Sequence, residues 1–390
     1  MEIKVVYRTI VILLYCIGVQ WVAAQETEFY FPGYGEQWKQ LSPEEAGMDP
    51  ALLQEAVRFA KNSESRIPVD LEKFIAETFA GEPYNNIIGP TKERGPATGV
   101  ILRHGYKVAE WGEPNRVDMT FSVTKSFLSA VAGIAFDHGL IRDVHDPVSE
   151  YVQDGGFDSP QNDGITWHQL LNMTSEWEGT LWGKPDWADR PVGERGEYHK
   201  RELQEPGTHW KYNDVRVNRL ALSLLRVIRE PLPKVLREYV MEPIGASRTW
   251  EWHGYENSWV KVDGVNVQSV SGGGHWGGGM VINAYDMARF GLLCLRNGNW
   301  NGEQILSEEW IEKSMTPTGL QPTYGYMNWF LNTGRELLPG APPSSYFHAG
   351  AGDNLIIVIP DYDLVIVVRW LERANRDEFV GKVLQAITSN

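Results

Sequence analysis

Two serine–lysine pairs in this chain have a spacing that could activate a nucleophile. Ser122-Val123-Thr124-Lys125 and the segment from Ser258 to Lys261 both place a lysine three residues after a serine. On a helix, this spacing puts both side chains on one face. Ser122 opens the most apolar predicted helix, whereas Ser258 lies in polar, turn-rich sequence where its lysine can be solvated. The context therefore favours Ser122 and Lys125 as the reactive pair.

The position of Lys125, one turn inside an apolar helix, suggests how the pair could work. Burial favours the neutral form of an amine unless the charge is paired. A neutral amine could accept the proton of the Ser122 hydroxyl, and the helix N-terminus would stabilise the anion that forms. The motif alone equally allows a structural interpretation, in which Ser122 caps the helix and the Lys125 ammonium reaches solvent.

Other catalytic motifs are missing from the sequence. No histidine pair has the spacing of a zinc protease, and neither a Gly-x-Ser-x-Gly elbow nor a phosphate-binding loop occurs. Gly272, Gly274 and Gly277 match a dinucleotide-binding pattern, but no strand–turn–helix unit surrounds them, so we interpret them as a close-packed glycine turn. We therefore expect neither a metal nor a cofactor.

Two further segments complete a family resemblance. His209-Trp210-Lys211-Tyr212-Asn213-Asp214 precedes a predicted helix, and Tyr346-Phe347-His348-Ala349-Gly350-Ala351-Gly352 lies on a late predicted strand. In order and spacing, the three motifs resemble the serine β-lactamase and penicillin-binding-protein superfamily. The most similar branch is that of the class C β-lactamase-related hydrolases, which includes family VIII carboxylesterases, DD-peptidases, D-aminopeptidases and nylon-oligomer hydrolases. The resemblance covers roughly residues 40 to 388.

The resemblance implies a role for each motif. Ser122 corresponds to the nucleophile, Lys125 to its activating amine, and Tyr212 to the group that passes the proton to the leaving group. His348 and Gly350 form the third motif. The backbone N–H groups of the nucleophile and of the alanine after the third motif form the oxyanion hole; these are the N–H groups of Ser122 and Ala351. Such fixed donors stabilise the developing oxyanion by a few kcal/mol each.

Two departures from the family pattern bear on the substrate. Asp214 stands where asparagine is usual, and an ionised aspartate cannot donate a hydrogen bond to a substrate amide; it could equally be the N-cap of the next helix. His348 replaces a lysine that often binds a substrate carboxylate, and histidine is mostly uncharged at neutral pH. Both departures favour an esterase or amidase over a β-lactamase or DD-peptidase. A non-catalytic ligand-binding relative is the alternative of another class.

The chain contains 16 tryptophans, some of which could line a substrate cleft. Aromatic walls would favour apolar, aromatic or sugar-bearing substrates, so the expected ligand is a small ester, an amide or an acylated sugar. Most tryptophans in a protein of this size are anchors of the core or of loops. The candidates for the cleft are Trp111, Trp177, Trp182, Trp187, Trp210 and Trp276, of which Trp177, Trp182 and Trp276 are our choice.

The predicted elements place strands at both ends of the chain and helices in the middle. Strands are expected at 98–103, 106–111, 324–331, 345–349, 354–359 and 364–370, and helices at 50–60, 122–136, 167–172, 215–228, 232–240, 284–296 and 377–387. This order predicts an α/β (α+β) fold of the β-lactamase/transpeptidase type, in which an antiparallel sheet from both termini carries an inserted helical region. The sheet part covers about 50–120 and 280–390, and the helical part covers about 121–279.

Composition and charge limit the partners. The 390 residues are 42% hydrophobic and 22% charged, which is typical of a globular chain. The formal net charge is −15, and no cluster of lysine and arginine appears, which argues against nucleic acids and anionic membrane surfaces as partners.

The first 24 residues have the pattern of a secretory signal peptide. Lys4 and Arg8 precede a short apolar run, and Val22-Ala23-Ala24 offers a cleavage site. The mature chain, residues 25–390, would then be secreted or periplasmic and without a stable membrane anchor. Removal of the signal also removes Cys16, so Cys294 would remain as a single cysteine that cannot form an internal disulfide.

Overall fold

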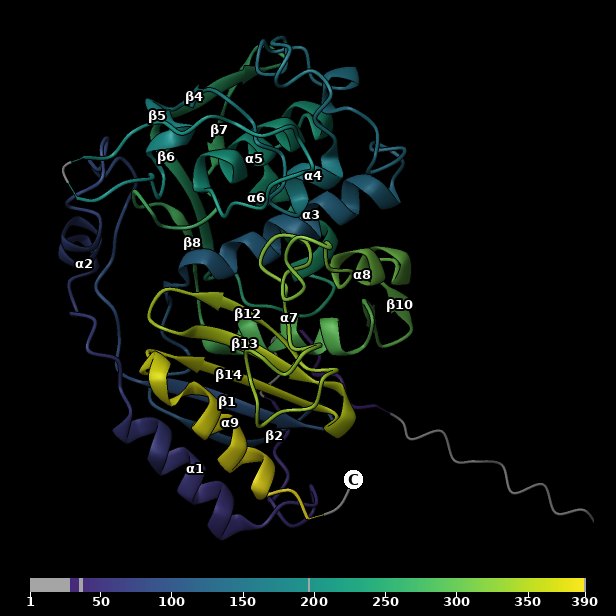
Figure 1. Cartoon of the computed structure of the whole chain (residues 1–390). Coiled ribbons are helices and arrows are strands. Elements are labelled where there is room, and N and C mark those ends of the chain that lie inside the picture. The colour runs from purple at the N-terminus through teal and green to yellow at the C-terminus, as the bar shows by residue number, and fades with distance from the viewer. Residues whose placement is uncertain (1–28, 35–37, 196, 389–390) are drawn as a thin grey trace, which may run out of the picture.

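The computed structural model describes residues 29–34, 38–195 and 197–388 (Figure 1). The expected signal peptide at residues 1–24, together with Cys16, lies outside these residues. None of the helices in the described ranges is long and apolar enough to cross a membrane. Cys294 is buried and carries a free thiol.

A six-stranded antiparallel sheet joins the two ends of the chain. Its strands lie in the order β11 (Phe330–Leu331), β12 (Tyr346–Gly350), β13 (Asn354–Ile359), β14 (Leu364–Arg369), β1 (Thr98–Arg103) and β2 (Tyr106–Trp111). The N-terminal hairpin β1–β2 extends the C-terminal strands because β1 pairs with β14, with Thr98 opposite Arg369. The predicted sheet from both termini is therefore confirmed, although β11 is shorter than the strand expected at 324–331.

Helices cover both faces of this sheet (Figure 1). The α1 (Pro50–Asn62) and α9 (Arg376–Gln385) helices cover one face, and α7 (Ala284–Leu295) packs on the other. The side chains of β14 alternate between these layers: Leu364, Ile366 and Val368 face α1 and α9, whereas Val365 and Val367 belong to the core that contains α7. The alternation explains why the central strands are apolar throughout.

The α3 helix (Thr124–Asp137) runs through the middle of the molecule, between the sheet and the helical region (Figure 1). All its residues from Thr124 to Ala135 are buried, as expected for a helix that is apolar all round. Around it lie α4 (Trp167–Leu171), α5 (Asp214–Ile228), α6 (Leu232–Leu236) with a π-helical turn at Arg237–Met241, and α8 (Glu308–Ser314).

The region predicted to be helices joined by loops also contains a second sheet, which the sequence interpretation missed. Its order is β3 (Asp118–Met119), β8 (Gly279–Ile282), β6 (Glu251–Val262) and β7 (Val265–Val270). A shift in register between Gly254 and Trp259 disrupts the apolar–polar alternation of β6 and hides its strand pattern. Asp263-Gly264, with both φ angles positive, was the available hairpin signal. The remaining elements are α2 (Leu71–Thr78), β4 (Thr180–Leu181), β5 (Lys184–Pro185), β9 (Asn299–Trp300) and β10 (Glu303–Gln304).

The run of glycines from Gly272 to Gly279 is a close-packed turn, as predicted. A Cβ atom on Gly277 would lie 2.2 Å from the carbonyl oxygen of Gly89, and Gly277 has a φ of +81°. Gly273 packs directly against the backbone of Phe121, because its Cβ would lie 2.8 Å from that carbonyl oxygen. This turn therefore packs against the backbone of the segment that carries Ser122 and supports it.

Candidate active site

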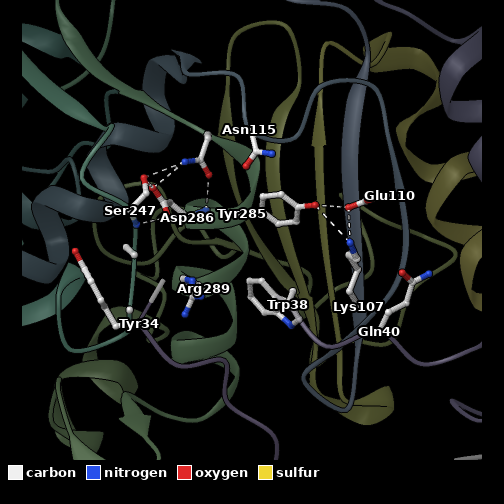
Figure 2. Close-up of a pocket in the computed structure, with 13 residues that line it drawn as sticks. Tyr34, Trp38, Gln40, Lys107, Glu110, Asn115, Ser247, Tyr285, Asp286 and Arg289 are labelled. Carbon is white, nitrogen blue, oxygen red and sulfur yellow. Dashed lines mark hydrogen bonds and ion pairs between the residues drawn. The ribbon is translucent and has the colours of Figure 1, made fainter. Parts of the chain in front are cut away.

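The described residues form several cavities of similar size, with volumes of about 740, 670 and 660 Å³, and the first of these has no arrangement for nucleophilic catalysis. It has a volume of about 740 Å³ and lies beside β2 and the first turn of α7 (Figure 2). Several of its polar side chains form hydrogen bonds or ion pairs with one another: Lys107 Nζ lies 2.7 Å from Glu110 Oε2, and the Ser247 hydroxyl donates to Asp286 at 2.5 Å. The serine in this cavity therefore faces a carboxylate and has no neighbouring lysine.

The second cavity is a cleft of about 670 Å³ that contains Ser122. Its walls come from the segment after α1, the start of α3, the loop before α5, the end of β12 and the segment after β14. The cleft lies at the β11–β12 side of the sheet, whereas the first cavity adjoins the opposite edge strand, β2. Ser122, Tyr212, Gly350 and Ala351 all line it, so residues from three distant motifs converge there.

A tight turn presents Ser122 to the cleft. Residues Phe121–Val123 form a single 3₁₀ turn ahead of α3, and Phe121 has a φ of +49°, which is costly for a bulky residue. Gly350 at the end of β12 lies so close that an added Cβ would be 2.1 Å from the carbonyl oxygen of Thr120. The absence of a side chain at this position therefore allows β12 to dock beside the nucleophile.

Lys125 is positioned to act on Ser122, but as a charged group. Its Nζ donates a hydrogen bond to Ser122 Oγ at 3.0 Å and lies 2.5 Å from Asp214 Oδ1. Burial alone would lower the pKa of Lys125, but the Asp214 carboxylate, together with Tyr212, raises it above its usual value. The expectation of a neutral Lys125 amine is therefore wrong, because the sequence did not reveal the carboxylate that pairs with it.

Asp214 is the first residue of α5 and is not its cap. The N-cap is Asn213, whose side-chain oxygen accepts a hydrogen bond from the backbone N–H of Arg216 at 3.0 Å. The capping alternative for Asp214 is therefore wrong. The Asp214 carboxylate does not line the cleft either, because it points at Lys125 and, through Oδ2, at Arg190 Nη1 at 2.9 Å. Burial opposes ionisation, but Lys125 and Arg190 hold the pKa of Asp214 well below its usual value.

Tyr212 lies between two cations. Its ring centroid is 5.0 Å from Lys125 Nζ and 4.9 Å from the guanidinium carbon of Arg190. Tyr212 also lines the cleft, so it lies between the two cations and the space that a substrate would occupy. The sequence analysis did not find Arg190, since neither a motif nor its spacing marks it.

Only part of the third motif reaches the cleft. Gly350 and Ala351 line the cleft, whereas the side chain of His348 is fully buried and does not reach it. The ring of His348 lies 4.8 Å from that of Trp329 and 5.7 Å from that of Phe290. Burial lowers the pKa of His348 to about 3, so the imidazole is neutral as expected, but this geometry does not bring it to a substrate.

The three tryptophans chosen from the sequence also lie outside the cleft. Trp177 and Trp182 line a different cavity near Asp154, and Trp276 is fully buried beside His275. The large apolar surface of these side chains is used for packing. The apolar wall of the cleft instead consists of smaller and dispersed residues, whose positions gave no periodic signal: Ile67, Phe74, Phe330, Leu337 and Phe347.

The buried neutral His348 predicts a loss of stability in acid. Its folded pKa of about 3 lies below the ordinary histidine value of 6.5, so the unfolded chain binds the extra proton between these two values. The free energy of unfolding is therefore highest above pH 6.5, and it decreases as the pH falls towards 3. From pH 7 to pH 4.5, we expect His348→Phe to lose about 2 kcal/mol less unfolding free energy than the unaltered protein. Urea denaturation at both pH values measures this, and equal losses would contradict a neutral, buried His348.

Comparison with known proteins agrees with this geometry. Residues 91–382 match the beta-lactamase family. Among solved structures, a beta-lactamase from Mycobacterium bovis has a TM-score of 0.54 at 19% identity, covering 81% of this chain and 100% of that one. A family VIII carboxylesterase has a TM-score of 0.55 at 15% identity, covering 87% and 99%.

A curated relative from Escherichia coli O157:H7, provisionally named a D-alanyl-D-alanine carboxypeptidase, is 22% identical over 269 residues. This alignment covers 57% of this chain and 61% of the relative, so the chain spans about three-fifths of that protein's length. The family match covers well over half of the chain and includes all three motifs. The chain therefore belongs to the beta-lactamase family of serine hydrolases.

Proposed function

We propose that this chain cleaves an ester or amide bond through an acyl-enzyme on Ser122. The observation that carries the proposal is the convergence of three side chains at one cleft. Ser122 Oγ accepts a hydrogen bond from Lys125 at 3.0 Å, and Tyr212 lies against Lys125 and lines the same cleft. A non-catalytic binding protein has no need of this arrangement, so the trio argues against that alternative.

The charged state of Lys125 decides how the proton moves. Because the ammonium is paired with Asp214, it donates to Ser122 Oγ and cannot take a proton from it. In the proposed step Tyr212 is the base: in its phenolate form, it accepts the serine proton as Oγ attacks the carbonyl carbon. The backbone N–H groups of Ser122 and Ala351 hold the oxyanion. Tyr212 then returns the proton to the leaving group, and water hydrolyses the acyl-enzyme.

Covalent labelling tests the nucleophile directly. The protein would be exposed to a fluorophosphonate and to a panel of esters, amides and β-lactams, and the adducts would be found by intact mass and peptide mapping. We expect a single adduct on Ser122. Label on another serine, or none at all, would refute the proposal.

The substrate preference is expected to lie with esters. A β-lactamase must hold a carboxylate next to the scissile bond, but His348 is neutral and turned away from the cleft. A short-chain aryl ester needs the nucleophile, the oxyanion donors and an apolar wall such as Phe330 and Phe347 provide. We expect kcat/KM for a p-nitrophenyl acetate or butyrate ester to exceed that for a cephalosporin by at least about tenfold, or roughly 1.4 kcal/mol. Steady-state kinetics on both substrates provides the comparison.

One observation favours a second candidate, a β-lactamase or DD-peptidase. Arg66 and Arg373 line the cleft and are exposed, and the structure pairs neither guanidinium with a carboxylate side chain of the described residues. Either could hold a substrate carboxylate. If cephalosporin turnover exceeds ester turnover, the variants Arg66→Gln and Arg373→Gln should raise its KM. A β-lactamase or DD-peptidase would then replace an esterase or amidase as the first candidate.

We also propose that the chain is exported and acts in a secreted or periplasmic location. The support is the pattern of Lys4, Arg8, the apolar run and Ala23-Ala24. Expression with the natural N-terminus in a host with a secretory pathway, followed by N-terminal sequencing, tests this. A mature protein that begins at Gln25 would support the proposal, and retention of Met1 in the cytoplasm would refute it.

A further inference from the structure

A buried histidine lies directly behind the Lys125–Asp214 pair. His275 Nε2 is 2.8 Å from Glu82 Oε2, and its Nδ1 is 3.2 Å from Asp189 Oδ1 and 3.4 Å from Asp214 Oδ2. The side chain of His275 is fully buried. Phe79 stacks on the imidazole ring with centroids 3.8 Å apart, and Trp276 packs against it at 4.2 Å. Neither the three motifs nor the cleft lining includes His275.

The positions of the surrounding carboxylates favour an imidazole that carries both protons. A carboxylate can only accept hydrogen bonds, and carboxylates face both ring nitrogens of His275. A neutral imidazole has one N–H, so the other nitrogen would point a lone pair at a carboxylate in a site without solvent. The carboxylates also raise the pKa of His275 to about 10, although burial alone would lower it.

The imidazolium balances the charges around the catalytic groups. The ion pairs of this cluster join three carboxylates and three cations: Glu82, Asp189 and Asp214, and Lys125, Arg190 and His275. Asp189 connects His275 to the groups around Lys125. It accepts a hydrogen bond from the backbone N–H of Asp214, and it lies 2.5 Å from Arg190 Nη1. Without the imidazolium, one negative charge would be in excess beneath Lys125 and Tyr212.

We propose that His275 is a positioning residue whose imidazolium holds Asp189 and Asp214 in place, so that Lys125 and Arg190 both stay directed at Tyr212. The inference rests on the proposed function only for its effect on the reaction. In this cluster the imidazolium provides the cation that the carboxylates need. The donor atoms of Glu82, Asp189 and His275 lie within 4.8 Å of one another, as the ligands of a divalent metal would, and the experiment distinguishes these two arrangements.

The first test follows the rate of fluorophosphonate labelling of Ser122 against pH. His275→Gln leaves three carboxylates against two cations, and the excess negative charge opposes the formation of an anion at Ser122. We expect the midpoint of the ascending limb to move upwards by about one pH unit or more, with labelling at pH 7 at least about tenfold slower. Glu82→Gln removes one negative charge instead, so its midpoint should move downwards.

The double variant His275→Gln, Glu82→Gln is the matched control. Its formal charge balance equals that of the unaltered protein, so its midpoint should return to within about 0.3 pH units. A purely structural histidine predicts additive losses at every pH with an unchanged midpoint, and that result would overturn the proposal. Thermal denaturation of each variant checks that the fold is retained.

The second test does not depend on catalysis or on any variant. In protein labelled with ¹⁵N-histidine, the His275 ring should show imidazolium shifts for both nitrogens from pH 6 to pH 8. A neutral ring over this range, or a shift of its signals on adding Zn²⁺ at micromolar concentration, would overturn the proposal. If the unaltered protein shows an imidazolium but no label on Ser122, the proposed function fails and the charge state of His275 stands.

Discussion

The variant Ser122→Ala is expected to lower kcat/KM for the best ester by at least about 10⁴-fold, because it removes the atom that forms the acyl-enzyme. The oxyanion donors and the cleft remain, so the residual rate reflects binding and polarisation of the carbonyl alone. The fold should not change, since Ser122 is only half-buried and the turn that carries it is held by Gly273 and Gly350. Ester kinetics and intact mass after fluorophosphonate treatment measure the loss.

The second Ser-x-x-Lys segment provides the control. Ser258 is fully buried on β6, where its hydroxyl accepts the backbone N–H of Tyr255 at 2.9 Å and donates to the carbonyl of Ser269 at 2.7 Å. Lys261 is exposed and, three positions along a strand, lies on the other face. Ser258→Ala should therefore lower stability by about 1–3 kcal/mol and leave kcat/KM unchanged. A loss of turnover in folded Ser258→Ala with full activity in Ser122→Ala would reverse the assignment.

The nucleophile and the main sheet could be predicted because their signals are local. The β1–β2 hairpin and the β13 strand have the bounds expected from sequence, and α3 is the buried helix that its apolar run indicated. Gly350 belongs to the third motif for a reason that the structure makes visible, namely its contact with Thr120. The hairpin, the strand and the helix are each marked by the pattern of a short segment, whereas the contact that explains Gly350 joins two distant segments.

The electrostatics of the site could not be predicted in this way. The cluster around Lys125 is drawn from five separate segments, and nothing in the sequence indicates that Glu82, Arg190 and His275 belong to it. The neutral-lysine expectation was wrong because a buried amine responds to the nearest opposite charge, and Asp214 is 89 positions away along the chain. Sequence spacing gives no measure of such a distance in space.

The residues that form the wall of the cleft could not be predicted from the sequence either. Trp276 was chosen as a large aromatic residue that could line the cleft, but the glycines around it close the chain tightly, which buries the ring. His348 was chosen for its place in the motif, and the alternation of β12 turns it towards Phe290 while Phe347 lines the cleft. Which face of a strand meets the substrate depends on the packing of the neighbouring layers.

Removal of the Lys125 charge should affect both catalysis and stability, and a second substitution can separate the two. In Lys125→Met, the hydrogen bond to Ser122 Oγ is lost and one of the two cations beside Tyr212 disappears. We expect kcat to fall by at least about 10²-fold. The same change leaves the Asp214 carboxylate buried with one cation fewer, which should cost about 3–5 kcal/mol of unfolding free energy.

The double variant Lys125→Met, Asp214→Asn separates the loss of kcat from the loss of unfolding free energy. Asparagine does not need a counter-charge, and the remaining Glu82 and Asp189 are balanced by Arg190 and His275. We therefore expect the double variant to regain most of the lost stability in urea denaturation. Its kcat should stay at least about 10²-fold below that of the unaltered protein, because the ammonium that donates to Ser122 is still missing. Recovery of turnover together with stability would mean that Lys125 is needed for folding alone, and Tyr212 with Arg190 would then suffice to activate the serine.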